Sequence, residues 1–193
     1  MHLAFSEKLT TSQKMNNPSI KNMNETKTLQ LSKWQLFWHY FLGLIPLSVG
    51  IMNSYWLIEI YNTENYSGIR TEKEIITSII VWFSLALLVF IIKKRRLNFV
   101  RIDISLDESE FKDRMLEIAE KENWRLTNNT KRFAKFSNGS GWTWGLNMTV
   151  LRYENYLLVN SICDPEMRSC ISVFNENERN INRLKKNLKK ASG

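Results

Sequence analysis

The sequence predicts an α+β protein: an N-terminal transmembrane helical hairpin followed by a small antiparallel-sheet domain with two helices. Two observations predict the hairpin, namely two long apolar runs and the concentration of basic residues beside them. A third predicts the domain. After residue 97, apolar residues recur about every two residues in some segments and about every 3.6 residues in others, as they do where strands and helices follow one another.

Residues 1–33 are polar, rich in Asn, Lys, Thr and Ser, and without apolar periodicity. Such a segment buries too little apolar surface to offset the chain entropy that it would lose on folding. We therefore expect residues 1–33 to be a disordered segment.

The first apolar run, residues 34–60, is long enough to cross a bilayer. It is less purely apolar than the second run, since it contains His39, Pro46, Asn53 and Glu59 among others. His39 and Glu59 stand close enough to the two ends to reach water. Aromatic residues, which favour the membrane–water interfaces, gather at both ends: Trp34, Trp38 and Tyr40 at one, and Tyr55, Trp56 and Tyr61 at the other.

Small residues within the first run predict close helix packing. Gly43 and Gly50 are seven residues apart, and Gly50 with Ser54 forms a small-xxx-small pair. We expect this stripe to pack against the second helix or against another copy of the chain. Pro46 has no N–H to donate to the carbonyl of Leu42, so a kink is expected near that position.

The second apolar run, residues 75–92, has 18 residues and no charge. At about 1.5 Å per residue it would span about 27 Å, close to the thickness of the hydrocarbon core. A surface helix of a soluble protein would show a polar stripe, and this run has none. It is predicted to be a second transmembrane helix, with residues 61–74 as an external hairpin loop.

Lysine and arginine set the expected orientation. Residues 1–33 carry five lysines, and the second span is followed by Lys93, Lys94, Arg95 and Arg96, whereas the connector has only Arg70 and Lys73. Because basic residues are retained on the cytoplasmic side, both termini are expected there. The basic linker, residues 93–97, is typical of a stop-transfer anchor; the alternative is a site for an anionic lipid headgroup.

Residues 98–193 are expected to form the α+β domain. Apolar and polar residues alternate over 98–106, which predicts a half-buried strand. Asp107 followed by Glu110 resembles a capping box, and a helix follows it. Four further strands are expected over residues 124–130, 132–138, 146–153 and 156–163, the last two as a hairpin. A final helix buries Ile181, Leu184 and Leu188.

Several kinds of chemistry are excluded for this domain. Its residues include no histidine, since His2 and His39 both precede it, so histidine acid–base catalysis is not expected. There is no P-loop, dinucleotide-binding glycine pattern or zinc-ligand spacing, so neither a cofactor nor a metal is expected. Cys163 and Cys170 would pair in an oxidising compartment and stay as thiols in a reducing one. No base stands near enough in sequence to make either an obvious nucleophile.

The net charge of +8 does not by itself predict nucleic-acid binding. Residues 98–193 hold 16 Lys and Arg against 13 Asp and Glu, so most of the excess lies beside the predicted spans. The final helix is basic and would contact anionic lipid or RNA, or else simply present a solvated face. Because the excess has this distribution, no nucleic-acid partner is expected.

Trp142 and Trp144 stand in a glycine-rich stretch, which is unusual for such large apolar side chains. Three interpretations remain open. The two indoles pack over an open edge of the sheet, dip into the membrane interface, or form a ligand or partner site.

The segment Leu157 to Leu184 contains the run VNSICDP and resembles the C-terminal pattern of a family of uncharacterised two-pass membrane proteins from Bacteroidota-type bacteria. The Trp144–Gly145 pair is also similar, whereas Cys170 replaces a serine. The resemblance implies the two-span architecture and an inner-membrane location, but no activity. It marks five positions for testing: Asn160, Ser161, Asp164, Pro165 and Arg168.

These observations predict a bacterial inner-membrane protein that works as a binding or scaffolding module rather than as an enzyme. Its expected partners are a bilayer with anionic lipids and either another membrane protein or a second copy. The candidate binding residues are Trp142, Trp144, Asn160, Asp164 and Arg168. Two alternatives stay open. One is an enzyme on a membrane-associated substrate using Asp164, Arg168 and Cys163; the other is a small oligomeric transporter or channel component in which His39 or Asn53 faces a water-filled helix interface.

Overall fold

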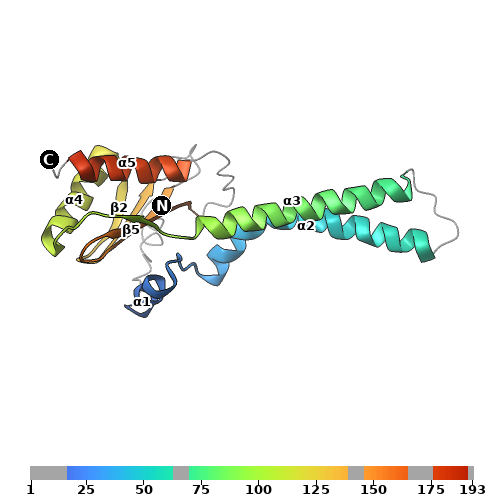
Figure 1. The fold of residues 1–193 in the computed structure, drawn as a ribbon, viewed down its shortest axis with the longest axis horizontal. Helices are drawn as coiled ribbons and strands as arrows, with labels where there is room; N and C mark the ends of the chain where they lie inside the picture. Colours follow the sequence, from blue (N-terminus) through green and yellow to red (C-terminus); the bar gives the residue numbers. More distant parts are fainter. Residues whose placement is uncertain (1–16, 63–69, 139–145, 165–175, 191–193) are drawn as a thin grey trace, which may run out of the picture. The chain divides into compact units, whose positions relative to one another are not determined.

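The structure of the chain is a computed structural model that describes residues 17–62, 70–138, 146–164 and 176–190 (Figure 1). The chain divides into two compact units. One comprises residues 31–96 and is called the hairpin below. The other combines residues up to 30 with residues from 97 onward and is called the α+β domain.

The hairpin consists of two long helices packed against each other, α2 (Lys33–Asn62) and α3 (Glu72–Arg96). Each begins with the same reciprocal cap. The Ser32 hydroxyl accepts from the Gln35 N–H at 3.2 Å, and the Gln35 side chain accepts from the Ser32 N–H at 3.1 Å. Thr71 and Glu74 repeat this arrangement at the start of α3. These two capping boxes satisfy N–H groups that have no partner within the helix, and so fix where each helix starts.

Contacts between the two helices follow a stripe of small residues on α2. A Cβ added to Gly43 would lie 3.2 Å from the ring of Phe90, and one added to Gly50 would lie 3.3 Å from the ring of Phe83. The absence of a side chain at these positions leaves room for an aromatic ring from α3. The helix continues through Pro46, which lies on the same buried face.

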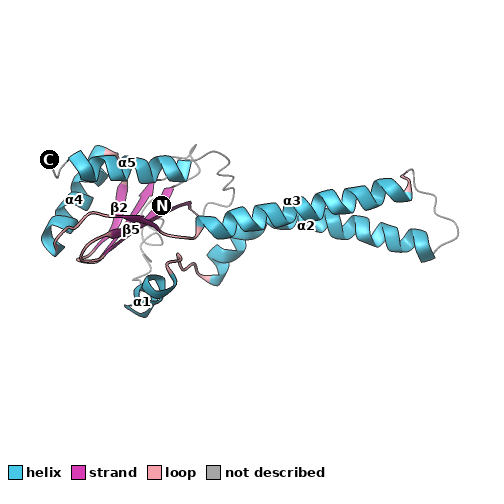
Figure 2. Cartoon of the chain, viewed as in Figure 1, coloured by secondary structure: helices cyan, strands magenta, loops and turns pink. Residues whose placement is uncertain are grey.

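The α+β domain is built on a five-stranded antiparallel sheet in the order β1-β5-β4-β3-β2 (Figure 2). Its strands are β1 (Val100–Ile102), β2 (Arg125–Asn129), β3 (Phe133–Asn138), β4 (Leu146–Arg152) and β5 (Leu157–Cys163). The predicted hairpin of β4 and β5 is confirmed, and its turn is closed by a hydrogen bond from the N–H of Tyr153 to the carbonyl of Tyr156.

Two helices, α4 (Glu108–Lys121) and α5 (Glu176–Lys190), complete the core with the sheet. The Asp107 side chain accepts from the N–H of Glu110 at 2.7 Å, as the predicted cap requires. Leu184 and Leu188 of α5 are buried, as predicted, and Ile181 packs against the same core. The α+β class, with two packed N-terminal helices before a sheet and two more helices, is therefore confirmed.

Two elements differ from the expectation. Residues 17–26 form helix α1 (Asn17–Thr26) in the segment that was expected to be disordered. Met23 is fully buried, and the N–H of Leu29 donates to the carbonyl of Leu97 at 2.8 Å. These contacts join residues that are far apart in sequence, so local composition did not reveal them. The first strand is also shorter than predicted and ends at Ile102.

Candidate functional site

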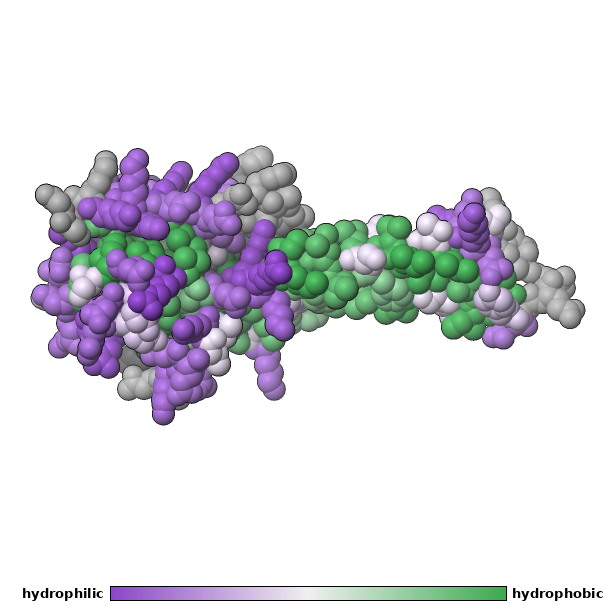
Figure 3. Space-filling model, viewed as in Figure 1, coloured by the Kyte–Doolittle hydropathy of each residue, from purple (hydrophilic) through white to green (hydrophobic). Residues whose placement is uncertain are grey.

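The surface of the hairpin is apolar (Figure 3). Ile80 and Leu87 of α3 are 61% and 62% exposed, and ten or more further aliphatic and aromatic residues of the two helices are exposed as well. Both helices are long and apolar enough to cross a membrane. Only 22% of the apolar window of α2 and 11% of that of α3 is buried, whereas the core helix of a soluble protein would be mostly buried.

The buried face of α2 has the opposite character. It consists of small and polar residues: Gln35, His39, Gly43, Pro46, Gly50 and Asn53. His39 was expected to reach water, but it is only 6% exposed because it lies one turn before Gly43 on the face turned to α3. Its Nε2–H donates to the carbonyl oxygen of Lys93 at 3.0 Å.

Asn53 is the other buried polar residue in the middle of this helix pair. It is 2% exposed, and its side-chain amide donates to the carbonyl of Val49 in its own helix at 2.8 Å. Its side-chain oxygen has no hydrogen-bond partner among the residues that the structure describes. His39 and Asn53 therefore lie inside the pair of helices, on the side of α2 away from its exposed apolar surface.

The residues predicted for helix packing act in two ways. Gly43 and Gly50 receive the rings of Phe90 and Phe83. Ser54 instead donates its hydroxyl hydrogen to the carbonyl of Gly50 in its own helix at 2.9 Å. The tight contact between the helices thus depends on the two glycines.

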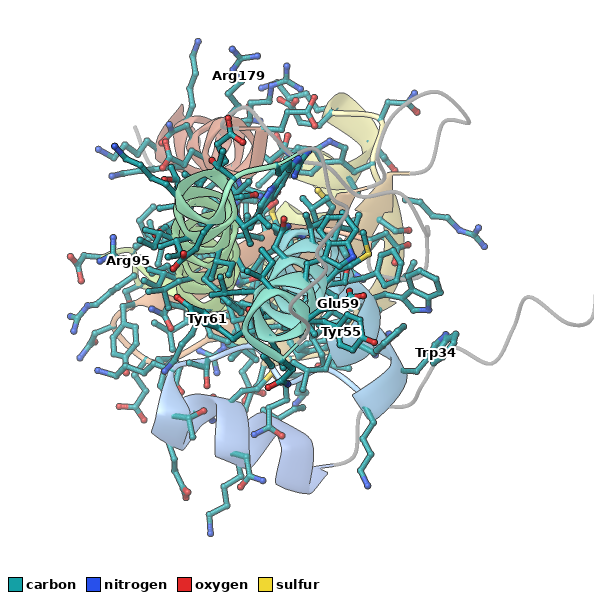
Figure 4. All side chains as sticks on the ribbon, turned by 90° about the vertical axis from the view of Figure 1, so that its right-hand side faces the viewer. Trp34, Tyr55, Glu59, Tyr61, Arg95 and Arg179 are labelled. Atoms are coloured by element: carbon teal, nitrogen blue, oxygen red, sulfur yellow. The ribbon has the colours of Figure 1, made fainter. Side chains whose placement is uncertain are left out.

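Aromatic residues mark both ends of α2. Trp34 and Trp38 meet edge to face with ring centroids 5.5 Å apart, and the Trp34 side chain projects away from its helix (Figure 4). At the other end Tyr55 and Tyr61 are both about two-thirds exposed. The hydroxyl of Tyr61 donates to the carboxylate of Glu72, which joins the ends of the two helices.

The basic run predicted to meet lipid headgroups forms the last turn of α3. Cations in a last turn interact favourably with the C-terminal end of the helix dipole. Lys94 and Arg95 are exposed, and Arg95 projects outward in Figure 4. Lys93 is only 6% exposed, so within this run it is the residue least able to meet a headgroup.

Of the five residues predicted to form a binding site in the α+β domain, Trp142, Trp144 and Arg168 lie outside the described residues. Asn160 is on β5 and is only 1% exposed. Its side-chain amide donates to the backbone carbonyl of Asn98 at 2.8 Å, which ties β5 to the residues before β1. Asp164 follows the end of β5. The described residues therefore give Asn160 a structural role, and the grouping of the five residues stays a prediction.

The cysteine at the end of β5 is oxidised: Cys163 is disulfide-bonded, and the described residues include no free cysteine. A sulfur in a disulfide is not a thiolate and cannot attack a substrate. The proposed enzymatic role of Cys163 therefore requires that this bond first be reduced.

A groove of about 1090 Å³ lies in the α+β domain, between α1 and the turns that follow β2 and β4. Arg152 organises its floor by donating to the carbonyls of Leu106 and Lys131, both at 2.9 Å. Lys131 pairs with Glu108 at 2.9 Å and holds the pKa of that carboxyl below its usual range. The described residues that line the groove include four basic side chains against two acidic ones, and three of the basic ones share the carboxylate of Glu108, so the lining keeps an excess of positive charge. Sequence analysis missed Arg152, since only its spatial neighbours reveal its role.

Neither a protein-family model, nor a curated protein, nor a solved structure matches this chain. Within the described residues, no three His, Cys, Asp or Glu side chains gather closely enough to hold a metal ion. The geometry of the described parts is therefore the basis for a functional proposal.

Proposed function

We propose that this chain is a two-pass membrane protein whose hairpin anchors the α+β domain, and that the domain acts by binding rather than by catalysis. The observation that carries the proposal is the polarity of the hairpin. Its small and polar residues are buried between the helices, and its large apolar residues face outward. Burying one large aliphatic side chain is worth about 1.5–3 kcal/mol, so such an outer surface in water would be strongly unfavourable.

The ends of the hairpin support the same proposal. Exposed Trp34, Tyr55 and Tyr61 are the side chains that a membrane–water interface favours. The starts of both helices carry capping boxes, so N–H groups without a partner inside the helix are satisfied there. Within α2 the exception is at Pro46, which has no N–H to donate to the carbonyl of Leu42. Apart from this position and their ends, helices satisfy their own backbone groups, as a span in hydrocarbon requires.

Charge and sulfur chemistry give opposite indications of the side of the membrane on which the α+β domain lies. Nine Lys and Arg flank the spans on the side of the termini, against two in the connector, which favours a cytoplasmic domain in a bacterial inner membrane. The disulfide at Cys163 is of a kind that persists in oxidising compartments. We propose the cytoplasmic orientation because the charge difference is large, and we expect the disulfide to be reduced there.

Thiol labelling tests both parts of the orientation. A non-permeant maleimide is applied to intact cells and to cells opened on the cytoplasmic side, each with and without prior reduction. Labelling only in opened cells, without reduction, agrees with the proposal. Labelling of intact cells after reduction would show that the α+β domain lies on the outer side instead. Extraction of the protein from membranes by alkaline carbonate would contradict membrane anchoring altogether.

The transporter alternative keeps one specific observation in its favour, namely buried polar groups at His39 and Asn53. In a transporter these groups would line a path for ions or protons. Ion flux into reconstituted vesicles is measured for the wild type and for the His39→Leu and Asn53→Leu variants. A binding module gives no flux in any of the three, whereas a transporter gives a flux that the two substitutions reduce.

A further inference from the structure

The excess positive charge of the α+β domain is concentrated on one helix. Helix α5 holds six Lys and Arg against two Glu, whereas the remaining residues from 98 to 193 hold ten against eleven. Without α5 the domain would be almost neutral. The helix is therefore the element on which an anionic partner would exert the strongest attraction.

The cations of α5 form a stripe rather than a ring. Arg179, Arg183 and Lys186 follow one another at intervals of four and three residues, so they lie on one face of the helix. Lys189 stands three residues beyond Lys186, and all four are exposed. Arg179 projects away from the helix into open space in Figure 4.

The opposite face of α5 holds the helix in place. Leu184 and Leu188 are 0% and 2% exposed, and Asn187 donates to the carboxylate of Glu122 at 2.7 Å. Arg183, at the edge of the stripe, pairs with the same carboxylate at 3.9 Å. The basic stripe therefore belongs to a helix that is already folded against the core. A partner would meet the cations without the entropic cost of forming the helix.

The chain also limits how far the domain can move from the hairpin. Only residues 97–99 separate the end of α3 at Arg96 from the start of β1 at Val100. Four steps of at most about 3.6 Å give a reach of about 14 Å. If the hairpin lies in a bilayer, the domain is held at a high effective concentration beside the headgroups.

We propose that the outward face of α5, formed by Arg179, Arg183, Lys186 and Lys189, docks on an anionic lipid surface. This inference rests on the proposed membrane anchoring. The charge of the stripe is complementary to acidic headgroups, and the short connection favours the bilayer over a dissolved polyanion. Each Lys or Arg near such a surface contributes about a fivefold change in the docking equilibrium.

The test uses the full chain in nanodiscs, with an environment-sensitive fluorophore attached at an exposed α5 position through Asn182→Cys. One set of nanodiscs contains only zwitterionic lipid and the other about a third anionic lipid. Docking is expected to shift the emission to shorter wavelength in the anionic set, and about 0.5 M salt is expected to reverse the shift by screening. Nanodiscs expose both faces of the bilayer, so the native orientation does not affect the result.

Two charge-matched variants separate the stripe from general positive charge. The test variant combines Arg179→Gln, Lys186→Gln and Lys189→Gln, and is expected to weaken docking about a hundredfold. The control combines Lys112→Gln, Lys121→Gln and Arg125→Gln, three exposed cations outside α5, and is expected to keep the shift. Far-UV circular dichroism verifies that both variants are folded.

The outcomes of this test are distinct. A chain that fails to stay with zwitterionic nanodiscs overturns the membrane proposal itself. A chain that stays, but shows no lipid-dependent shift or the same loss in both variants, overturns the docking of α5 alone. A shift produced by single-stranded RNA in zwitterionic nanodiscs, and not by anionic lipid, would identify a nucleic-acid surface instead and likewise overturn the proposal.

Discussion

The hairpin and the α+β domain solve the same packing problem with opposite residues. In the domain, the largest of the fully buried side chains are apolar, Phe111 and Phe136 among them. In the hairpin, α2 buries glycine, histidine and asparagine and exposes isoleucine, phenylalanine and tryptophan. Both patterns minimise free energy, but for different surroundings: the domain pattern suits water and the hairpin pattern suits hydrocarbon.

The difference extends to how contacts are made. The core of the domain is filled by side chains of comparable size, such as Trp124 edge to face with Phe136 at 5.7 Å. In the hairpin, a large aromatic side chain packs against a glycine, which has no side chain: Phe90 against Gly43 and Phe83 against Gly50. In the proposed bilayer, lipid would provide no hydrophobic drive for two helices to associate, so close approach of their surfaces would have to supply the attraction.

The largest expected effect is in the core of the domain. Phe136→Ala removes a fully buried ring from β3 and should lower the free energy of unfolding of the domain by about 3–5 kcal/mol. Chemical denaturation in detergent, followed by the fluorescence of Trp124, measures it. Leu116→Ala, at a half-exposed site on α4, is the control and should change little. Equal losses in the two variants would mean that the domain is not organised around this core.

The second effect lies on the surface of the hairpin. Leu87→Arg places a charge on the outer face of α3, which should cost about 2.5–3.5 kcal/mol if that face meets hydrocarbon. The fraction of chains inserted, read from a glycosylation reporter in microsomes, should fall. Leu116→Arg makes the same change on α4 and should leave insertion unaltered. If Leu87→Arg were as harmless as its control, the surroundings of the two units would not differ as described.

The third effect tests a largely buried charge in the α+β domain. Arg152 has a side chain only 10% exposed and donates to two backbone carbonyls. Arg152→Ala leaves those acceptors without a donor and should cost about 1–3 kcal/mol. Arg152→Lys keeps the charge but loses the forked geometry, so thermal unfolding should place it between the wild type and alanine variant. A lysine variant as unstable as alanine would show that geometry, rather than charge, matters at this site.

The smallest effect concerns the contact between the two helices. Gly50→Ile fills the space of the Phe83 ring and should weaken helix pairing by about 1 kcal/mol, at the low end of overpacking effects. Energy transfer between fluorophores at the two ends of the hairpin measures the pairing. Combining Gly50→Ile with Phe83→Ala should restore much of it, because the two changes compensate in volume. If the losses of pairing free energy in the two single variants simply added in the double variant, Gly50 and Phe83 would have no interaction energy with each other.

The sequence was most informative where a local pattern and the final environment agree. The final helix is one example, because the spacing of Ile181, Leu184 and Leu188 specifies a buried face whatever else the chain does. The β4–β5 hairpin is another, since its strands are adjacent and joined by a short turn. The residue spacing of the capping boxes at Ser32 and Thr71 is also present in the sequence, but these caps were not predicted from it, and the hydrogen bonds in the structure establish them.

Features that depend on distant residues could not be predicted. The burial of Met23 requires contacts outside its own helix, and the role of Arg152 requires the carbonyls of Leu106 and Lys131. His39 was misjudged because its distance from the end of the run was considered, whereas its face on the helix decides its exposure. The candidate binding residues were proposed from a glycine-rich stretch and from a resemblance in sequence, neither of which specifies which side chains meet in space.

The short pairing of residues 27–29 with residues 97–99 has a consequence for how the protein is made. The carbonyl of Lys27 accepts from the N–H of Phe99, and the N–H of Leu29 donates to the carbonyl of Leu97. Topologically, the hairpin is thus an insertion within the domain, and the ribosome must finish it before the domain can close. An odd number of membrane crossings would leave the two paired segments on opposite sides of the bilayer. If the hairpin lies in a membrane, as proposed, completion of the fold therefore excludes a chain in which only one of the two helices has crossed.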